Sequence, residues 1–93
     1  MRDIPFISEE HIDKLLTWSE ITDALFSVHQ RPEADINDIL LQSKNSSLLS
    51  RAAWVENYGI AVKTATIFPD NATKFQDLPT VQSLVILFDD NSG

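Results

Sequence analysis

The chain has 93 residues, of which 43% are hydrophobic and 23% are charged, and this composition is typical of one small globular domain and excludes a disordered chain. The absence of cysteine excludes a disulfide framework and a thiolate zinc site. A net charge of -7 without a run of lysine or arginine argues against nucleic acid and anionic membranes as partners. Since neither a membrane-spanning run nor a signal-peptide core is present, we expect a cytoplasmic protein.

The first third of the sequence predicts two helices with acidic outer faces. Ser8 is well placed as the N-cap of the first helix, ahead of two glutamates that the helix dipole favours. We expect this helix to be interrupted at Trp18 and Ser19, and the second to end at Arg31-Pro32. The predicted buried residues of the first helix are Ile12, Leu15 and Leu16, and the apolar stripe of the second is Ile21, Ala24, Leu25 and Val28.

Short apolar runs separated by turn residues follow, and they predict strands joined by hairpins. The run Ile60–Phe68 alternates most clearly, with Lys63 on the side of Ala61 and Ala65. The run Val81–Phe88 is nearly all apolar, which predicts a strand buried on both faces. Further strands are expected over 39–41 and 48–55. The fold class is therefore α+β, with a helical pair in residues 1–32 and a mainly antiparallel sheet in residues 33–93.

Several kinds of site can be excluded from residue types alone. Gly59 and Gly93 are the only glycines, so neither a P-loop nor a GxGxxG fingerprint exists in the chain. His11 and His29 have no acidic neighbour at a convincing metal-ligand spacing, so no metal site is expected. The strand half contains serines but no histidine to activate them, which argues against a hydrolytic triad.

Three residues remain as candidate binding residues. Lys63 has small neighbours in its strand, so a substrate carboxylate could reach its ammonium group, although the residues alone favour a lysine that lies on a solvated face or reaches to an edge of the sheet. Arg51 is a second cation, able to bind a carboxylate through two hydrogen bonds. Thr80 follows a proline turn, where its hydroxyl could reach a phosphate or ribose or could be a plain turn residue.

The segments SRAAWVENYGIAVKTATIFPDN and LPTVQSLVILFDD carry a specific pattern within residues 50–90. This pattern resembles the N-terminal part of the ornithine cyclodeaminase/μ-crystallin family, and a weaker resemblance extends over residues 4–30. The resemblance implies that residues 1–93 form the N-terminal part of a substrate-binding and dimerisation domain. The nucleotide-binding Rossmann domain of such a protein would then lie outside this chain.

The resemblance also implies residue roles. Lys63 falls on the family lysine that contacts the carboxylate end of the substrate, and Thr80 falls on a threonine that contacts the NAD or NADP supplied by the following domain. The family's catalytic aspartate and glycine-rich loop have no counterpart here, so no catalytic residue is assigned. By itself the chain is expected to be inactive and to bind no cofactor.

The function that the resemblance implies for the full-length protein is NAD(P)-dependent chemistry on a cyclic imino acid or amino acid, by a homodimer. Two reactions fit, namely reduction of a ketimine such as pyrroline-2-carboxylate and cyclodeamination of ornithine to proline. Cyclodeaminases usually carry a carboxylate-binding arginine where this chain has residues 35–38 without one, which favours the reductase and leaves Arg51 as its substitute. The alternative is a stand-alone, non-enzymatic α+β interaction module.

Overall fold

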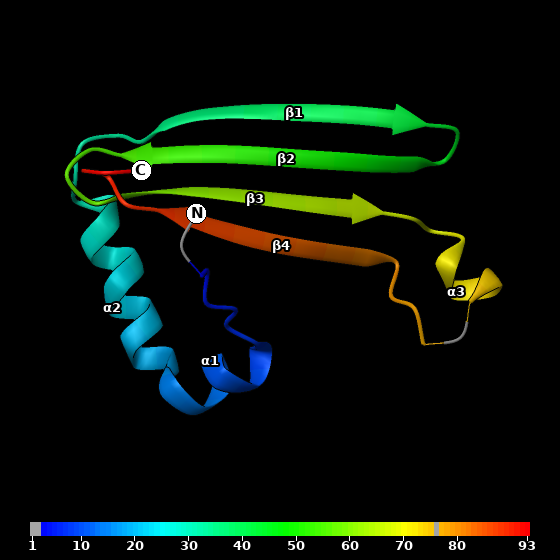
Figure 1. Ribbon diagram of the computed structural model, residues 1–93, viewed down its shortest axis with the longest axis horizontal. Coiled ribbons are helices and arrows are strands. Elements are labelled where there is room, and N and C mark those ends of the chain that lie inside the picture. Colours follow the sequence, from blue (N-terminus) through cyan, green and yellow to red (C-terminus); the bar gives the residue numbers. More distant parts are fainter. Residues whose placement is uncertain (1–2, 76) are drawn as a thin grey trace. The chain divides into compact units, whose positions relative to one another are not determined.

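The computed structural model describes residues 3–75 and 77–93, and the chain divides into two compact units, Met1–Arg31 and Pro32–Gly93. The first unit is helical and the second contains all the strands (Figure 1). This arrangement confirms the predicted α+β class, with helices first and an antiparallel sheet second. No βαβ unit is present in the described residues, since all three strand pairings are antiparallel.

The helical unit contains α1 (Glu9–Leu15) and α2 (Trp18–His29), each with a capping box at its start. The Ser8 side chain accepts a hydrogen bond from the backbone of His11 at 3.3 Å, which confirms the predicted N-cap. Thr17 caps α2 by accepting from the backbone of Glu20 at 3.1 Å, while the carboxylate of Glu20 accepts from the backbone of Thr17 at 3.2 Å. The predicted break between two helices is confirmed, but it lies at Leu16 and Thr17 and not at Trp18 and Ser19, because this reciprocal cap starts α2 at Trp18.

The predicted burial in α1 is also wrong. Ile12, Leu15 and Leu16 are 42%, 72% and 46% exposed. The seven residues of α1 make about two turns, and a helix this short offers too little surface to bury these side chains within its own unit. Neither this helix nor any other in the described residues is long and apolar enough to cross a bilayer.

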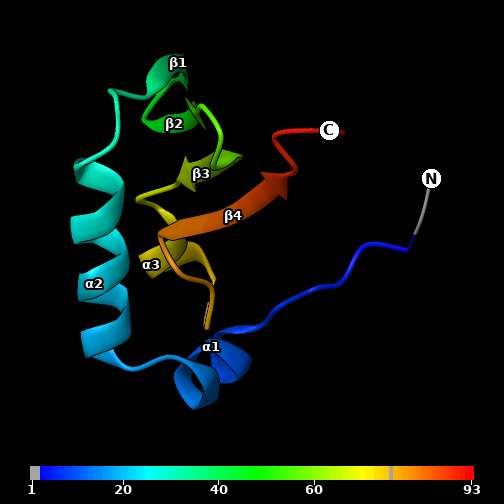
Figure 2. The same cartoon turned by 90° about the vertical axis from the view of Figure 1, so that its left-hand side faces the viewer.

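The second unit is a four-stranded meander in the order β1-β2-β3-β4 (Figure 1). Figure 2 shows the strands from one end, with β4 turned relative to β1 as the usual twist of a sheet requires. The strands match the predicted runs, although β1 extends well beyond the predicted 39–41. Their bounds are β1 Asp35–Ser43, β2 Ser46–Val55, β3 Gly59–Ile67 and β4 Val81–Phe88.

Turn geometry sets the register of the sheet. Between β1 and β2 only Lys44 and Asn45 intervene, so Ser43 pairs with Ser46 and every earlier residue of β1 has a fixed partner on β2. Lys44 adopts a φ of 53°, the left-handed value that a two-residue hairpin turn needs at its first central position. The register therefore follows from two residues at the tip of the hairpin.

The connection from β3 to β4 contains a short helix, α3 (Asn71–Lys74), which the sequence pattern does not predict. Asn71 is only 6% exposed, and its side-chain amide donates to the carbonyl of Pro79 at 3.0 Å. The backbone of Phe68 donates to the carbonyl of Thr80 at 2.8 Å and closes the loop at its base. The loop thus begins just after β3, as the Pro69-Asp70-Asn71 turn predicts.

Apolar side chains of the sheet are largely exposed. Ala65, at 7%, is the one buried apolar residue in the described part of the chain. The prediction that β4 is buried on both faces is wrong, since every residue of Val81–Phe88 is exposed. The physical reason is that, among the described residues, no helix of its own unit packs on the faces of the sheet, and β4 in addition lies at an edge and pairs with β3 alone. The sheet therefore presents large apolar side chains that its own unit does not cover.

Candidate functional site

A row of three charged side chains crosses the middle of the sheet. Asp38 on β1 pairs with Arg51 on β2, and Arg51 pairs with Lys63 on β3. Residues directly opposite one another on neighbouring strands share a face and have Cβ atoms about 5 Å apart. The structure therefore brings together two of the residues that the sequence predicts, Arg51 and Lys63, and adds Asp38 beside them.

Within this row, Asp38 and Arg51 form a two-pronged ion pair. The guanidinium donates from Nε to Oδ1 and from Nη2 to Oδ2 of the carboxylate, both at 2.7 Å. The hydrogen bond from Arg51 lowers the pKa of Asp38, and the same bond raises the pKa of Arg51. Arg51 therefore already binds a carboxylate of its own chain, which weakens its predicted role as a substrate ligand.

Lys63 differs from Arg51 because its side chain has no ion-pair or hydrogen-bonding partner among residues 3–75 and 77–93. Its side chain is exposed, while Ala61 and Ala65 on either side of it leave its surroundings open. On β4 its opposite residue is Val85, which offers no charge. Lys63 is thus the cation of the row that can take up an external carboxylate.

An apolar hollow of about 270 Å³ lies on the sheet next to this row. Ala53 and Ala61 are two of its lining residues. Ala53 lies two positions after Arg51 in β2 and Ala61 two positions before Lys63 in β3, so both share the face of the charged row. Carbon atoms of a ligand could rest there while its carboxylate reaches the ammonium group. The complete lining is Ala53, Val55, Tyr58, Gly59, Ile60, Ala61, Leu87 and Phe88.

Thr80, the third predicted site residue, lies elsewhere. It precedes β4, where its carbonyl accepts from the backbone of Phe68. Phe68 is five positions along the strand direction from Lys63, a separation of about 17 Å at the usual rise of a strand. The described residues therefore do not form one small site that contains both Lys63 and Thr80.

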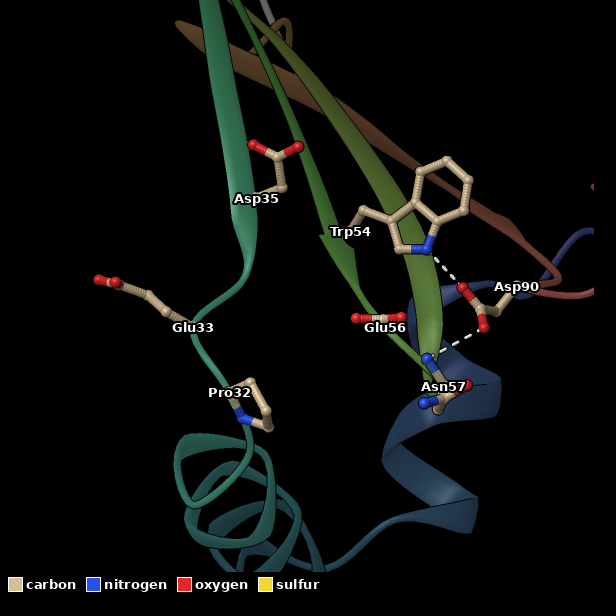
Figure 3. A pocket seen from close by; sticks show the side chains of 7 residues that line it. All are labelled: Pro32, Glu33, Asp35, Trp54, Glu56, Asn57 and Asp90. Carbon is tan, nitrogen blue, oxygen red and sulfur yellow. Dashed lines mark hydrogen bonds between the residues drawn. The ribbon is translucent and has the colours of Figure 1, made fainter.

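A second hollow, of about 460 Å³, lies at the opposite end of the sheet from the β1–β2 turn and was not predicted. Figure 3 shows Asp90 between Trp54 and Asn57, accepting from the indole Nε1 and, at 3.0 Å, from the backbone of Asn57. These bonds tie the end of β4 to the β2–β3 turn. The other lining residues are Pro32, Glu33, Asp35 and Glu56. No group of three or more potential metal ligands occurs in the described residues.

The two hollows and the pairing of Asp38 with Arg51 have no local signal in the sequence, because each brings together residues that lie far apart along the chain. Asp38 could have been found indirectly, since placing the hairpin turn at Lys44 and Asn45 carries Asp38 to Arg51 by register. Asp90 could not, because its link to Trp54 depends on how the end of β4 meets the β2–β3 turn.

Comparison with known proteins gives one informative similarity. The chain is 36% identical over 88 residues to a Delta(1)-pyrroline-2-carboxylate reductase from Paracoccus denitrificans. The match covers 95% of this chain and 27% of the relative, so the chain spans about a quarter of the length of the curated relative that it matches. No family model matches the chain, and no solved structure matches it significantly. The similarity supports the family resemblance of residues 50–90.

Proposed function

We propose that this chain is the N-terminal part of the substrate-binding domain of an NAD(P)-dependent reductase of the ornithine cyclodeaminase/μ-crystallin family. Its proposed substrate is a cyclic imino acid such as pyrroline-2-carboxylate. The similarity to a pyrroline-2-carboxylate reductase supports the reductase over the cyclodeaminase. The observation that carries the proposal is Lys63, an exposed cation without a partner in the described residues, beside an apolar hollow on the same face.

The chemistry of a cyclic imino acid suits this arrangement. Such a molecule has one carboxylate and an apolar ring, so it needs one cation and a nearby apolar surface. Lys63 would bind the carboxylate as a point charge, and the ring would lie toward Ala61 and Ala53. The role of this chain would be to hold and orient the substrate, which contributes to catalysis through positioning.

The chain does not contain the residues of a complete dinucleotide site. Its two glycines stand at a hairpin and at residue 93, and neither opens a helix. Reduction of an imine requires a hydride, which NAD(P)H supplies when bound, and Thr80 would make at most one contact with such a cofactor. We therefore assign no step through the cofactor to the residues of this chain.

The proposed partner is a second copy of the same protein. Exposed apolar side chains on both edge strands support it, because a sheet that buries only Ala65 in its own unit gains stability from a covering layer. Examples are Leu40, at 58% exposure, and Leu87, at 73%. The same exposure favours the alternative function, a non-enzymatic interaction module. Sedimentation equilibrium distinguishes a dimer from a monomer that awaits another protein.

The test of the proposed function is a steady-state assay of the protein expressed from its complete reading frame. We expect oxidation of NAD(P)H in the presence of pyrroline-2-carboxylate, and we expect Lys63→Ala to raise KM or abolish turnover. The loss of one charged contact in a partly exposed site corresponds to a factor of about 10 to 100. Lys74→Ala is the matched control, since Lys74 pairs with Asp70 outside the site. Near-normal kinetics for Lys63→Ala would disprove the role of Lys63.

A further inference from the structure

We infer that Asp38 determines specificity by occupying Arg51 and so restricting the Lys63 site to substrates with a single carboxylate. This inference rests on the proposed function, because it assumes that Lys63 binds a substrate carboxylate. It assigns a role to a residue that neither the sequence pattern nor the comparisons single out. The structural basis is the order of the row, with one anion and then two cations on three neighbouring strands.

Without Asp38, Arg51 and Lys63 would form a two-cation site. They lie directly opposite each other on β2 and β3, so their charged groups can reach two carboxylates of one small molecule. A guanidinium presents two parallel donors that match a carboxylate, and it binds planar anions well wherever it is accessible. The pair of cations alone would therefore favour a dicarboxylate over a monocarboxylate.

Asp38 removes this preference because it supplies a carboxylate from within the chain. Its two oxygens accept both hydrogen bonds of the guanidinium fork at 2.7 Å. A second carboxylate of a ligand would have to displace it, or it would meet the negative charge of Asp38. Lys63 has no such internal anion among the described residues and keeps its charge for the ligand. The site then offers one cation, which matches a molecule with one carboxylate.

The test compares two ligands that differ by one carboxylate, pyrrole-2-carboxylate and pyrrole-2,5-dicarboxylate, in NMR titrations of the protein expressed from its complete reading frame. In the unaltered protein, we expect both ligands to shift the signals of Lys63, and we expect the dicarboxylate to bind more weakly than the monocarboxylate because its second carboxylate meets the charge of Asp38. In Asp38→Asn, we expect the ratio of the dicarboxylate affinity to the monocarboxylate affinity to be about tenfold higher than in the unaltered protein, as one added charge-assisted contact allows. Asp38→Ser is measured in parallel, so the result does not depend on one variant.

Two controls separate the fork of Arg51 from a general change in charge. Asp70→Asn removes an equal charge from the ion pair of Asp70 and Lys74, and it should leave the ratio of the two affinities unchanged. Arg51→Gln added to Asp38→Asn should abolish the gain. An unchanged ratio in both Asp38 variants, or a gain that survives Arg51→Gln, would overturn the inference alone. Failure of pyrrole-2-carboxylate to shift Lys63 in the unaltered protein would overturn the proposed role of Lys63 and the inference with it.

Discussion

Asp38 and Arg51 face each other across β1 and β2 and share two hydrogen bonds of 2.7 Å. Arg51 also lies next to Lys63, so it stands between Asp38, the single anion of the row, and Lys63, the outermost cation. Like charges directly opposite each other on neighbouring strands destabilise a sheet. Asp38 therefore compensates for the placement of Arg51 beside Lys63, in addition to its proposed effect on specificity.

The first prediction concerns the effect of acidic pH on the stability that the Asp38–Arg51 ion pair provides. Because Arg51 lowers the pKa of Asp38 in the folded chain, folding favours the ionised carboxylate. The pair stabilises the fold at pH values above the ordinary aspartate pKa of about 4, and this contribution is lost as the pH falls through the lowered pKa. We expect Asp38→Asn to have a lower melting temperature than the unaltered chain near neutral pH.

The difference in melting temperature between Asp38→Asn and the unaltered chain should become smaller as the pH is lowered. Melting temperatures of both proteins, measured by circular dichroism from about pH 6 down to about pH 2, should converge at the acid end. Arg51→Gln should show the same convergence, since it removes the other half of the pair. A difference that stays constant across this range would mean that the ion pair does not contribute to stability.

The sequence predicts the strands well where side chains alternate or are uniformly apolar. Val81–Phe88 is recovered with its exact bounds, and the run Ile60–Phe68 differs from β3 by one residue at each end. It predicts β1 poorly, because the first half of this strand contains Asp35, Asn37 and Asp38, which rarely favour a strand. Pairing with β2 overrides their local preference. The extra length of β1 is what places Asp38 opposite Arg51.

Burial was harder to predict than secondary structure. The apolar run of β4 has the composition of a central strand, but its place in the sheet order makes it an edge. For the candidate site, residue types identify Lys63 and Arg51 as cations with strand neighbours, but only the register shows that Arg51 is already paired. The assigned roles of Lys63 and Thr80 remain predictions.

A second prediction concerns the β1–β2 turn. Lys44 has a φ of 53°, which costs a residue with a side chain more than it costs glycine. Lys44→Gly should therefore raise the free energy of unfolding by about 0.5–1 kcal/mol, after allowing for the greater freedom of glycine in the unfolded chain. Asn57, with a φ of 60°, gives a matched comparison, because asparagine tolerates this conformation better.

The measurement is urea denaturation of Lys44→Gly, Asn57→Gly and the unaltered chain. The gain should be larger at position 44 than at position 57. Equal stability of all three proteins, or a loss in Lys44→Gly, would contradict the left-handed turn conformation and the register that it sets.

The third prediction concerns the tether between β4 and the β2–β3 turn. Asp90 accepts from the indole of Trp54 and from the backbone of Asn57, so Asp90→Ala removes both bonds. We expect a loss of about 1 kcal/mol in the free energy of unfolding. In ¹⁵N-¹H spectra, the indole signal of Trp54 should move upfield and the amide of Asn57 should exchange faster with solvent. Trp18, on α2, provides the internal reference signal. Unchanged signals of Trp54 and Asn57 would show that the tether is absent in solution.

The last prediction concerns Asn71, which organises the loop between β3 and β4. Its side chain is 6% exposed and donates to the carbonyl of Pro79, while its backbone donates to the carbonyl of Phe68. Asn71→Ala leaves the Pro79 carbonyl without this donor in a partly buried position. The expected cost is about 1–3 kcal/mol of unfolding free energy. Because Thr80 directly follows Pro79, the loop would also lose the anchor that positions this proposed cofactor contact.

Asn45→Ala is the matched control, because Asn45 also donates through its side chain, to Asp70 at 3.0 Å, but is exposed. A surface bond of this kind should cost less than about 0.5 kcal/mol, since water replaces the lost partner. Urea denaturation of the two variants separates burial from the mere loss of a hydrogen bond. Equal costs would mean that the loop around Asn71 is open to water in solution. A large cost confined to Asn71→Ala would identify Asn71 as the residue that fixes the start of β4 and the position of Thr80 just before it.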